Sequence, residues 1–387
     1  MEKVCILFPY SMGEDFLSGG VGKLVLENLI ISVKKYETHL ILPINNKAFK
    51  VYIEKNIPNV IVHLTDFEFM AQYADTANKI KRIFLIFKSV FKTLIKKKNL
   101  EKEILLIKPD IVHLHAEVSF VYLKLIKEKG IKTIFHASSL RFAENKFLKN
   151  IVVNNVKKYA DCVISPTNSI GSLYSNKNKY IIENPIVIPK SNGNFLIEKE
   201  ILSDKRLKLV YTGRICRVKQ IHYLIQAFLK LPKESLEKIS LYVIGKPNNA
   251  GDEEYFADIK KLINKKLENI YFLGYKSNVQ EYLKYMDVGV LLSKSEAISM
   301  SSVEYMFSGL AVIGFNNPGI NEVVIDNYNG FLVDDPDIEK LKESILTCIY
   351  QKDKLLALKN NAKKYAYEHF SRDVFEKKLL SVYEEFI

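Results

Sequence analysis

The alternation of short apolar runs with helical segments constrains the fold of this chain more than any other feature of its 387 residues. Short, continuous apolar runs are typical of strands buried on both faces. Segments with a 3.6-residue repeat, such as HYLIQAFLKL at 222–231, separate them. Strands that alternate with helices predict parallel sheets covered by helices on both faces. The runs are VCILF, THLILP, DIVHLH, KTIFHA and DCVISP in the first half, and KLVYTG, SLYVIG, NIYFLG, VGVLLS and AVIGF in the second.

The length of the chain predicts two domains, since one domain takes roughly 150 residues. The stretch at 184–206 contains prolines and mixed charge without a clean period, which is typical of a linker. We therefore expect two doubly wound, Rossmann-like α/β domains, with a ligand at the C-terminal ends of their strands. The expected parts are an N-terminal domain at 1–188, a linker at 189–206, a C-terminal domain at 207–368, and a final helix at 369–387 that packs back on the first domain.

Two classes of protein are disfavoured by the composition. No apolar run reaches the ~18 residues of a membrane-spanning helix, and the start, MEKVCILFPY, is typical of a buried first strand rather than a signal peptide. The cysteines are far apart and no pair has metal-ligand spacing, so we expect reduced thiols and a cytoplasmic protein. They are Cys5, Cys162, Cys216 and Cys348.

The positive charge of the chain lies almost entirely in its first half. Residues 1–190 hold 29 Lys and Arg against 17 Asp and Glu, whereas the rest hold 28 against 27, within a net charge of +13. A basic half indicates an anionic partner, which can be nucleic acid, a membrane surface or a phosphorylated substrate. A lysine-rich composition of the source is the alternative.

Two cations follow a predicted strand in KLVYTGRICRVKQ, residues 208–220. Arg214 and Lys219 come after Gly213, at the strand's C-terminal end. A guanidinium offers a planar fork and an ammonium a point charge, and together they suit a diphosphate. Basic residues are also common at strand ends, so this motif alone is a weak signal.

Two carboxylates lie in the apolar segment SEAISMSSVEYMFSG, residues 295–309. Ser301 and Glu304 fit a capping box, which predicts a helix at 302–308 that ends before Gly309. Capping is the structural explanation of Glu304, and a solvated loop charge is that of Glu296. Alternatively, carboxylates on both sides of an anion-binding helix end suit a sugar nucleotide, which has hydroxyls on both sides of a diphosphate.

The second half resembles the retaining glycosyltransferases of family 4, the "group 1" class with the GT-B fold. The segment SKSEAISMSSVEYMFSGLAVI resembles the family's Glu-x7-Glu motif, and GRICRVK resembles its G-R-x-x-x-x-K. YVIGKP, NIYFLGY, YMDVGVLLS and NNPGINEVVIDNYNGFLV are also similar to family blocks. In the first half GGVGKLVLENL, DIVHLH and ADCVISPTNSI resemble the family's glycine loop, histidine strand and interdomain strand.

The resemblance implies roles for individual residues, in two domains that face each other across a cleft. Glu304 would hold the ribose hydroxyls and Glu296 the hydroxyls of the transferred sugar. Arg214 and Lys219 would stabilise the leaving diphosphate without a metal. The remaining donor-binding residues implied by the resemblance are Gly20, Tyr275, Ala297, Ile298, Ser299, Met300 and Ser301.

Two departures from the family pattern fall inside these motifs. The family's Gly-Phe-Gly after the first glutamate is Ala297-Ile298-Ser299 here, so two β-carbons lie where the family brings bare backbone to the donor. Gln220 stands where the family usually has glycine. The geometry around the donor sugar can therefore differ.

The first half holds two further motifs. SGGVGKLVLENL is not a P-loop, because Leu17 and Leu24 replace the required glycine and Ser/Thr. In DIVHLH, His113 and His115 alternate with apolar residues and so face one side of a strand. His115 matches the family's active-site histidine and is a candidate catalytic residue. His136 is a weaker candidate, and a buried structural histidine is the alternative for each.

Residues 80–98, IKRIFLIFKSVFKTLIKKK, form an amphipathic pattern. An apolar stripe of Ile and Phe opposes a basic one, and such a helix can lie on an anionic bilayer. Packing of the apolar stripe on the first domain's sheet is the alternative, and the two are compatible. The basic stripe consists of Lys81, Lys88, Lys92 and Lys96.

The sequence is therefore interpreted as a metal-independent, retaining glycosyltransferase without a cofactor, acting on a nucleoside diphosphate sugar and a glycan or lipid-linked acceptor. The rivals are an epimerase or phosphorylase on the same fold and a nucleic-acid-binding protein. The last is disfavoured because the lysines gather on one stripe rather than among exposed aromatic residues. The triplet at 335–337, DPD, is predicted to be a turn and a helix cap rather than a metal site.

Overall fold

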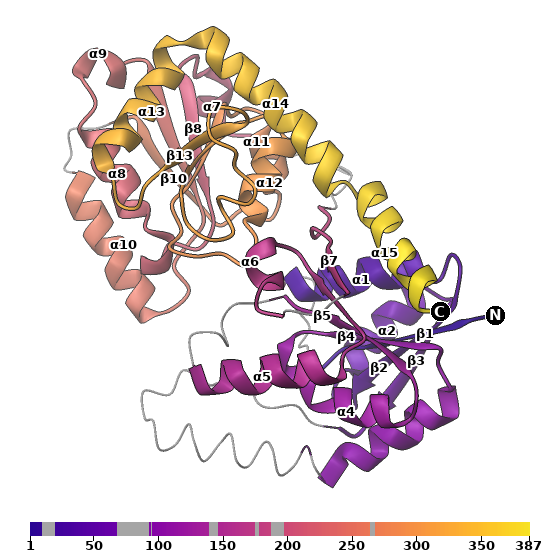
Figure 1. Cartoon of the computed structure of the whole chain (residues 1–387). Helices are drawn as coiled ribbons and strands as arrows, with labels where there is room; N and C mark the ends of the chain where they lie inside the picture. The colour runs from indigo at the N-terminus through magenta and orange to yellow at the C-terminus, as the bar shows by residue number, and fades with distance from the viewer. Residues whose placement is uncertain are drawn as a thin grey trace. The chain divides into compact units, whose positions relative to one another are not determined.

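The computed structural model describes residues 1–9, 20–67, 93, 95–138, 146–174, 178–186, 197–263 and 268–387. The chain forms two compact units. Unit 1 comprises Met1–Pro185 and Phe375–Ile387, and unit 2 comprises Ile186–Val374. Each unit is described by itself below (Figure 1).

Unit 1 contains a parallel sheet in the order β3-β2-β1-β4-β5-β6-β7. The strand order reverses between β1 and β4, which are hydrogen-bonded neighbours. This is the doubly wound arrangement, in which ligands bind where the order reverses. The strands are β1 (Lys3–Leu7), β2 (Glu37–Pro43), β3 (Val60–Thr65), β4 (Ile111–His115), β5 (Lys132–His136), β6 (Cys162–Ser165) and β7 (Lys179–Ile181).

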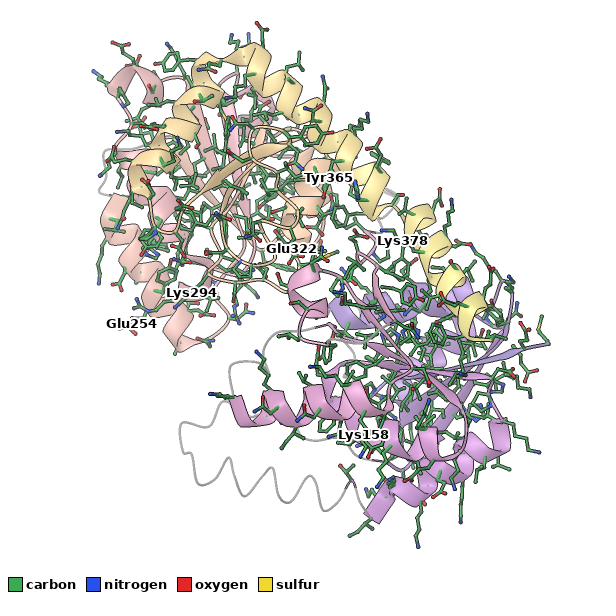
Figure 2. The ribbon with its side chains drawn as sticks, in the orientation of Figure 1. Lys158, Glu254, Lys294, Glu322, Tyr365 and Lys378 are labelled. Atoms are coloured by element: carbon green, nitrogen blue, oxygen red, sulfur yellow. The ribbon has the colours of Figure 1, made fainter. Side chains whose placement is uncertain are left out.

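The C-terminal helix α15 (Arg372–Phe386) supplies part of the core of unit 1. Its apolar face packs with side chains of β1, β2 and α1 around Phe375 and Tyr383. An ion pair between Lys378, labelled in Figure 2, and Glu183 adds a polar contact. The other helices of the unit are α1 (Gly20–Ser32), α2 (Lys47–Asn56), η1 (Glu117–Ser119), α4 (Phe120–Glu128), α5 (Lys146–Tyr159) and α6 (Asn168–Gly171).

Unit 2 contains a second parallel sheet, in the order β10-β9-β8-β11-β12-β13. Successive residues of β8 enter different cores, since Leu209 and Tyr211 belong to one cluster and Val210 to another. Because strand side chains alternate, these clusters are the two faces of one buried sheet. The strands are β8 (Leu207–Thr212), β9 (Ile239–Ile244), β10 (Ile270–Gly274), β11 (Val288–Leu291), β12 (Ala311–Phe315) and β13 (Gly330–Val333).

Helices cover both faces of the second sheet (Figure 1). Side chains of α8, α10 and α13 complete the cluster around Leu209, and those of α12 and α14 complete the cluster around Val210. The helices of unit 2 are α7 (Lys199–Ser203), η3 (Arg217–Lys219), α8 (Ile221–Leu229), α9 (Lys233–Leu236), α10 (Ala250–Ile263), α11 (Val279–Leu283), α12 (Met300–Phe307), α13 (Ile338–Tyr350) and α14 (Lys352–Phe370).

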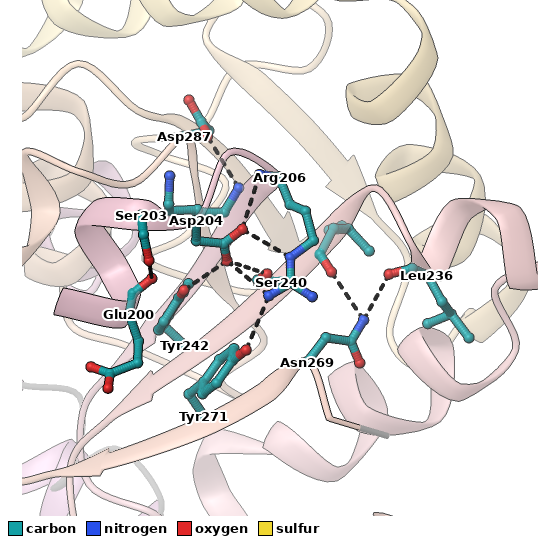
Figure 3. A network of polar contacts seen from close by, with 12 residues as sticks. Glu200, Ser203, Asp204, Arg206, Leu236, Ser240, Tyr242, Asn269, Tyr271 and Asp287 are labelled. Carbon is teal, nitrogen blue, oxygen red and sulfur yellow. Dashed lines mark hydrogen bonds and ion pairs between the residues drawn. The ribbon is translucent and has the colours of Figure 1, made fainter. Parts of the chain in front are cut away.

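The end of the expected linker is tied into unit 2. Ile201 of α7 is buried in the core, and Asp204 accepts hydrogen bonds from Ser240 and Tyr242 of β9 and pairs with Arg206 (Figure 3). Burial alone would raise the pKa of Asp204, but the hydrogen bonds from Arg206 and Ser240 hold it well below its usual range. Residues 199–206 are thus part of a folded domain.

The predicted fold class is confirmed, since all ten apolar runs form strands and every pair of neighbouring strands is parallel. The predicted cap at the DPD triplet is also confirmed, because Asp337 is the N-cap of α13 and accepts from the Lys340 N–H at 2.8 Å. Most of the predicted amphipathic helix at 80–98 lies outside the described residues.

Candidate active site

The strand order of unit 2 places the candidate donor-binding loops on either side of one point. The order reverses between β8 and β11, which pair directly through Leu209 and Val288. The loop after β8 carries Arg214 and Lys219, and the loop after β11 carries Glu296. All three residues therefore lie at the carboxyl edge where doubly wound sheets bind ligands.

The loop after β8 is held by its backbone. Gly213 donates to the Ile244 carbonyl at 3.0 Å, and the Tyr211 hydroxyl donates to the Arg214 carbonyl at 2.8 Å. The Arg214 side chain is 45% exposed, with Nε 3.7 Å from Asp252 Oδ2. At that length the pair is loose, so the guanidinium is available to an anionic ligand.

Lys219 and Glu296 form an ion pair. The two loops also join through their backbones, since the Lys294 N–H donates to the Val218 carbonyl at 2.9 Å; Lys294 is labelled in Figure 2. Both charged side chains are only about one quarter exposed or less, at 24% and 20%. A diphosphate would compete for the ammonium and release the carboxylate for hydroxyl groups.

The backbone conformation of Gln220 explains why the family pattern usually has glycine at this position. Its backbone lies in the left-handed region, with φ 51° and ψ 29°, a conformation that costs a residue with a β-carbon roughly 1–2 kcal/mol. The Gln220 amide donates to Asp335 Oδ1 at 3.1 Å. Asp335 in turn accepts from Asn317 at 2.9 Å. These contacts tie the loops after β8, β12 and β13 together beside Lys219.

The predicted capping box is wrong. The N-cap of α12 is Ser299, whose hydroxyl accepts from the Ser302 N–H at 3.3 Å, so the helix begins at Met300. Glu304 is therefore the fifth residue of the helix and does not cap it. The predicted end is confirmed, because Gly309 has φ +81° and its N–H bonds to the Met306 carbonyl.

The loop that replaces the family's Gly-Phe-Gly rests on Gly319. The Glu296 N–H donates to the Pro318 carbonyl and the Ser299 N–H to the Gly319 carbonyl. A β-carbon on Gly319 would lie 2.3 Å from the Glu296 carbonyl oxygen. Ile298 and Ser299 are buried, so their side chains point away from solvent.

Other donor-binding candidates lie at the same edge or in the next turn. Tyr275 follows β10, is 68% exposed, and lies under the Lys246 ammonium at 5.5 Å from the ring centroid. Ala297 is half-buried in the Glu296 loop. The N–H of Met300 donates to the Ile298 carbonyl at 2.9 Å, and Ser301 is the second residue of α12.

The candidates of unit 1 lie at its own carboxyl edge. Gly20 is the first residue of α1, and His115 is the last residue of β4, paired in register with His136 of β5. His113 and His115 face one side of the strand as predicted, with ring centroids 4.4 Å apart. Burial lowers the pKa of both well below the ordinary value and that of His136 to about 3, so all three imidazoles are neutral.

These three histidines have the composition of a metal site, since their ring nitrogens lie within 4.8 Å of one another. However, His113 Nε2 and His136 Nδ1 are 3.2 Å apart in nearly parallel rings, and His113 Nδ1 contacts the Tyr383 hydroxyl at 2.7 Å. Asn28 occupies Nε2 of His115. Four of the six ring nitrogens thus form hydrogen bonds with one another or with their neighbours, which fits a metal poorly; His136 Nε2 is buried without a partner in the described part of the chain.

Comparison with known proteins shows which families this chain is similar to. Residues 194–365 match the family described as "Glycosyl transferases group 1". An uncharacterized glycosyltransferase of Methanocaldococcus jannaschii is 27% identical over 289 residues, which cover 70% of this chain and 72% of that protein. The chain is therefore similar to group 1 glycosyltransferases, most clearly in its second half.

Two further comparisons agree with this similarity. The capsular polysaccharide biosynthesis glycosyltransferase CapM of Staphylococcus aureus is 26% identical over 275 residues, 66% of this chain and 70% of CapM. The structure of Anabaena HepE in complex with UDP superposes with a TM-score of 0.75 at 17% identity and full coverage of both chains. This chain therefore has the GT-B fold, with two doubly wound units.

Some residues that contact the candidate site residues carried no signal in the sequence. Asn28 and Tyr383 reach the histidines from α1 and α15, and Gly319 supports Glu296 from the loop after β12. In the sequence, only the block NNPGINEVV, which is similar to a family block, pointed to Gly319. In the part of the chain that the structure describes, no helix is both long enough and apolar enough to cross a bilayer.

Proposed function

We propose that this chain is a glycosyltransferase that moves a sugar, with retention and without a metal, from a UDP-sugar to an acceptor hydroxyl in the synthesis of a bacterial surface polysaccharide or glycolipid. The observation that carries the proposal is the group of Arg214, Lys219 and Glu296 at the switch point of unit 2. HepE was solved with UDP, and CapM acts in capsular polysaccharide biosynthesis; both support this choice.

The proposed chemistry is electrostatic. Negative charge grows on the diphosphate as its bond to the sugar breaks, and Arg214 and Lys219 are preorganised to stabilise it. Glu296, released from Lys219, holds hydroxyls of the sugar as a positioning group. The departing diphosphate takes the proton of the acceptor hydroxyl, which attacks from the same face, so the sugar keeps its anomeric configuration.

A panel of sugar nucleotides tests the proposal. We expect one UDP-sugar to raise the melting temperature, and to be turned over with an acceptor in the presence of EDTA. Complete loss of turnover in EDTA, restored by magnesium or manganese, would contradict metal independence. An epimerase on the same fold would convert the sugar nucleotide without any acceptor.

Replacing Glu304 with alanine is expected to weaken UDP binding roughly 10- to 150-fold, because hydrogen bonds to a charged group contribute roughly 1.5–3 kcal/mol. Stability should change little, since Ser299 rather than Glu304 caps α12. Calorimetric titration with UDP measures the effect. The control is Glu343→Ala, which removes an exposed carboxylate from α13. Equal affinity in both variants would remove Glu304 from the ribose site.

We also propose that the first unit docks on anionic membranes through residues 80–98. Lysines near an anionic surface contribute about 1 kcal/mol each. Lys96 is paired with Asp66 at 2.8 Å, which reduces its contribution. Replacing Lys81, Lys88, Lys92 and Lys96 with glutamine should release the protein from phosphatidylserine-containing vesicles at low salt.

The vesicle experiment has a matched control of the same charge change. Four exposed lysines of unit 2 are replaced with glutamine instead, and we expect no loss of binding. If the unchanged protein ignores such vesicles at low salt, residues 80–98 serve core packing and a soluble acceptor is favoured. The control lysines are Lys233, Lys260, Lys261 and Lys364.

A further inference from the structure

The side chain of Asn28 contacts one of the two ring nitrogens of His115. Asn28 lies on α1, is completely buried, and places its amide nitrogen 2.8 Å from His115 Nε2. An amide NH₂ group can only donate. Nε2 must therefore accept, and the single proton of the neutral ring sits on Nδ1. No hydrogen-bond partner of Nδ1 lies among the residues that the structure describes.

The surroundings of His115 keep this ring neutral. Its ring stacks on His113 at 4.4 Å and on His136 at 5.0 Å between centroids. Burial lowers the pKa of His115 well below its usual range, and a positive charge on His113 or His136 would lower it further. Tyr383 of α15 joins the cluster through His113, and its burial raises its pKa, so it also stays neutral. No carboxylate contributes to the electrostatics of His115 in the described part of the chain.

The His113 ring is locked from both ends. Its Nδ1 contacts the Tyr383 hydroxyl at 2.7 Å, and its Nε2 contacts His136 Nδ1 at 3.2 Å. A ring with both nitrogens engaged cannot turn without breaking a buried hydrogen bond. His115 therefore stacks on a ring that is held in place. The contact with Asn28 restricts rotation of the His115 side chain.

We propose that Asn28 is a positioning residue that holds His115 as a neutral donor with its proton on Nδ1. His115 then offers a hydrogen bond to an oxygen lone pair of the substrate and does not remove a proton. The use of this donor in sugar transfer rests on the proposed function, whereas the tautomer does not. It agrees with a reaction in which the leaving diphosphate, not a protein base, takes the acceptor's proton.

Replacement of Asn28 by aspartate is expected to move the ring proton of His115 from Nδ1 to Nε2. A carboxylate has the same shape but can only accept, so it would draw the proton of His115 to Nε2 and favour the imidazolium. Between about pH 5 and pH 8, His115 should titrate in Asn28→Asp and remain neutral in the unchanged protein. A merely structural role of Asn28 would not move this titration.

Nitrogen NMR of the ¹⁵N-histidine-labelled full-length protein tests the tautomer without a substrate. The His115 signals are assigned by their loss in His115→Gln. We expect a protonated Nδ1 and a bare Nε2 throughout the pH range. A protonated Nε2 would mean that the Asn28 amide faces His115 with its oxygen, and this would overturn the proposal. The unchanged protein alone decides this point, even if Asn28→Asp fails to fold.

A second measurement tests the positioning role. Using the UDP-sugar found with the panel, we expect Asn28→Ala to lower kcat about tenfold, the loss of one hydrogen bond, with UDP affinity unchanged. Asn155→Ala, which removes a similar amide from α5, is the control and should keep full activity. Unchanged kcat in Asn28→Ala would overturn the proposal that Asn28 positions His115. Failure of the whole panel would remove the proposed function and leave the tautomer result standing.

Discussion

Replacing Arg214 with alanine is expected to lower the turnover of a UDP-sugar by about 10²–10³-fold, the usual effect of removing one donor that stabilises growing transition-state charge. The loop itself should keep its shape. Gly213 and Ile215 are hydrogen-bonded to the neighbouring loop through their backbones, and Tyr211 holds the Arg214 carbonyl. The 3.7 Å contact with Asp252 is too long to contribute much to stability.

The fall should appear mainly in kcat, because the interaction strengthens as the diphosphate departs. Steady-state kinetics with thermal unfolding as a check measure both quantities. Arg217→Ala is the matched control, since Arg217 lies in the same loop but its side chain is 69% exposed. Its ion pair with Asp258 is loose, at 3.8 Å. Equal losses in the two variants would indicate a general effect of charge rather than a specific contact with the leaving group.

The architecture was predictable because it depends on local patterns. Buried parallel strands are continuous apolar runs, and ten of them were identified without any tertiary information. The three missed strands, β3, β7 and β13, are short or partly exposed: β7 has three residues, β13 has four, and β3 alternates buried and exposed side chains. Such strands depend on their neighbours in the sheet rather than on their own sequence.

The start of α12 was not predictable from the local pattern. Ser299 and Ser301 are both good N-cap residues, and Ser301 also has a glutamate three residues later. Contacts from outside the segment determine which of the two serines caps the helix. Gly319, twenty residues on, binds the Ser299 backbone and packs on that of Glu296, which fixes where the chain enters the helix.

Contacts between distant segments set the remaining limits. Asn28 and His115 are 87 residues apart, and Lys219 and Glu296 are 77 apart. The second pair follows from the strand order once β8 and β11 are known to be neighbours. The first also requires the rotation of α1 about its axis, because only one face of that helix meets the end of β4. The sequence therefore singled out His115 as a candidate but could not predict its contact with Asn28.

Replacing Gly245 with alanine is expected to lower the free energy of unfolding of unit 2 by about 2–5 kcal/mol. Gly245 follows β9 with φ +149°, and an added β-carbon would lie 1.8 Å from the Gly213 carbonyl oxygen. The unfavourable backbone conformation costs roughly 1–2 kcal/mol, and relief of the clash by backbone movement roughly 1–3 kcal/mol more. The melting temperature of Gly245→Ala should fall by about 10 °C.

The effect should reach the active site, because the two glycine loops are hydrogen-bonded neighbours. Gly213 precedes Arg214, and the Ile215 N–H donates to the Lys246 carbonyl at 3.2 Å. Displacement of Gly213 would move the guanidinium, so UDP affinity should fall with stability. Gly274→Ala separates the two costs, since Gly274 has φ +68° at the same sheet edge but nothing within 4 Å of an added β-carbon. Calorimetric unfolding and UDP titration of both variants decide the matter: similar losses would mean that backbone conformation, not the close approach of the two loops, makes Gly245 necessary.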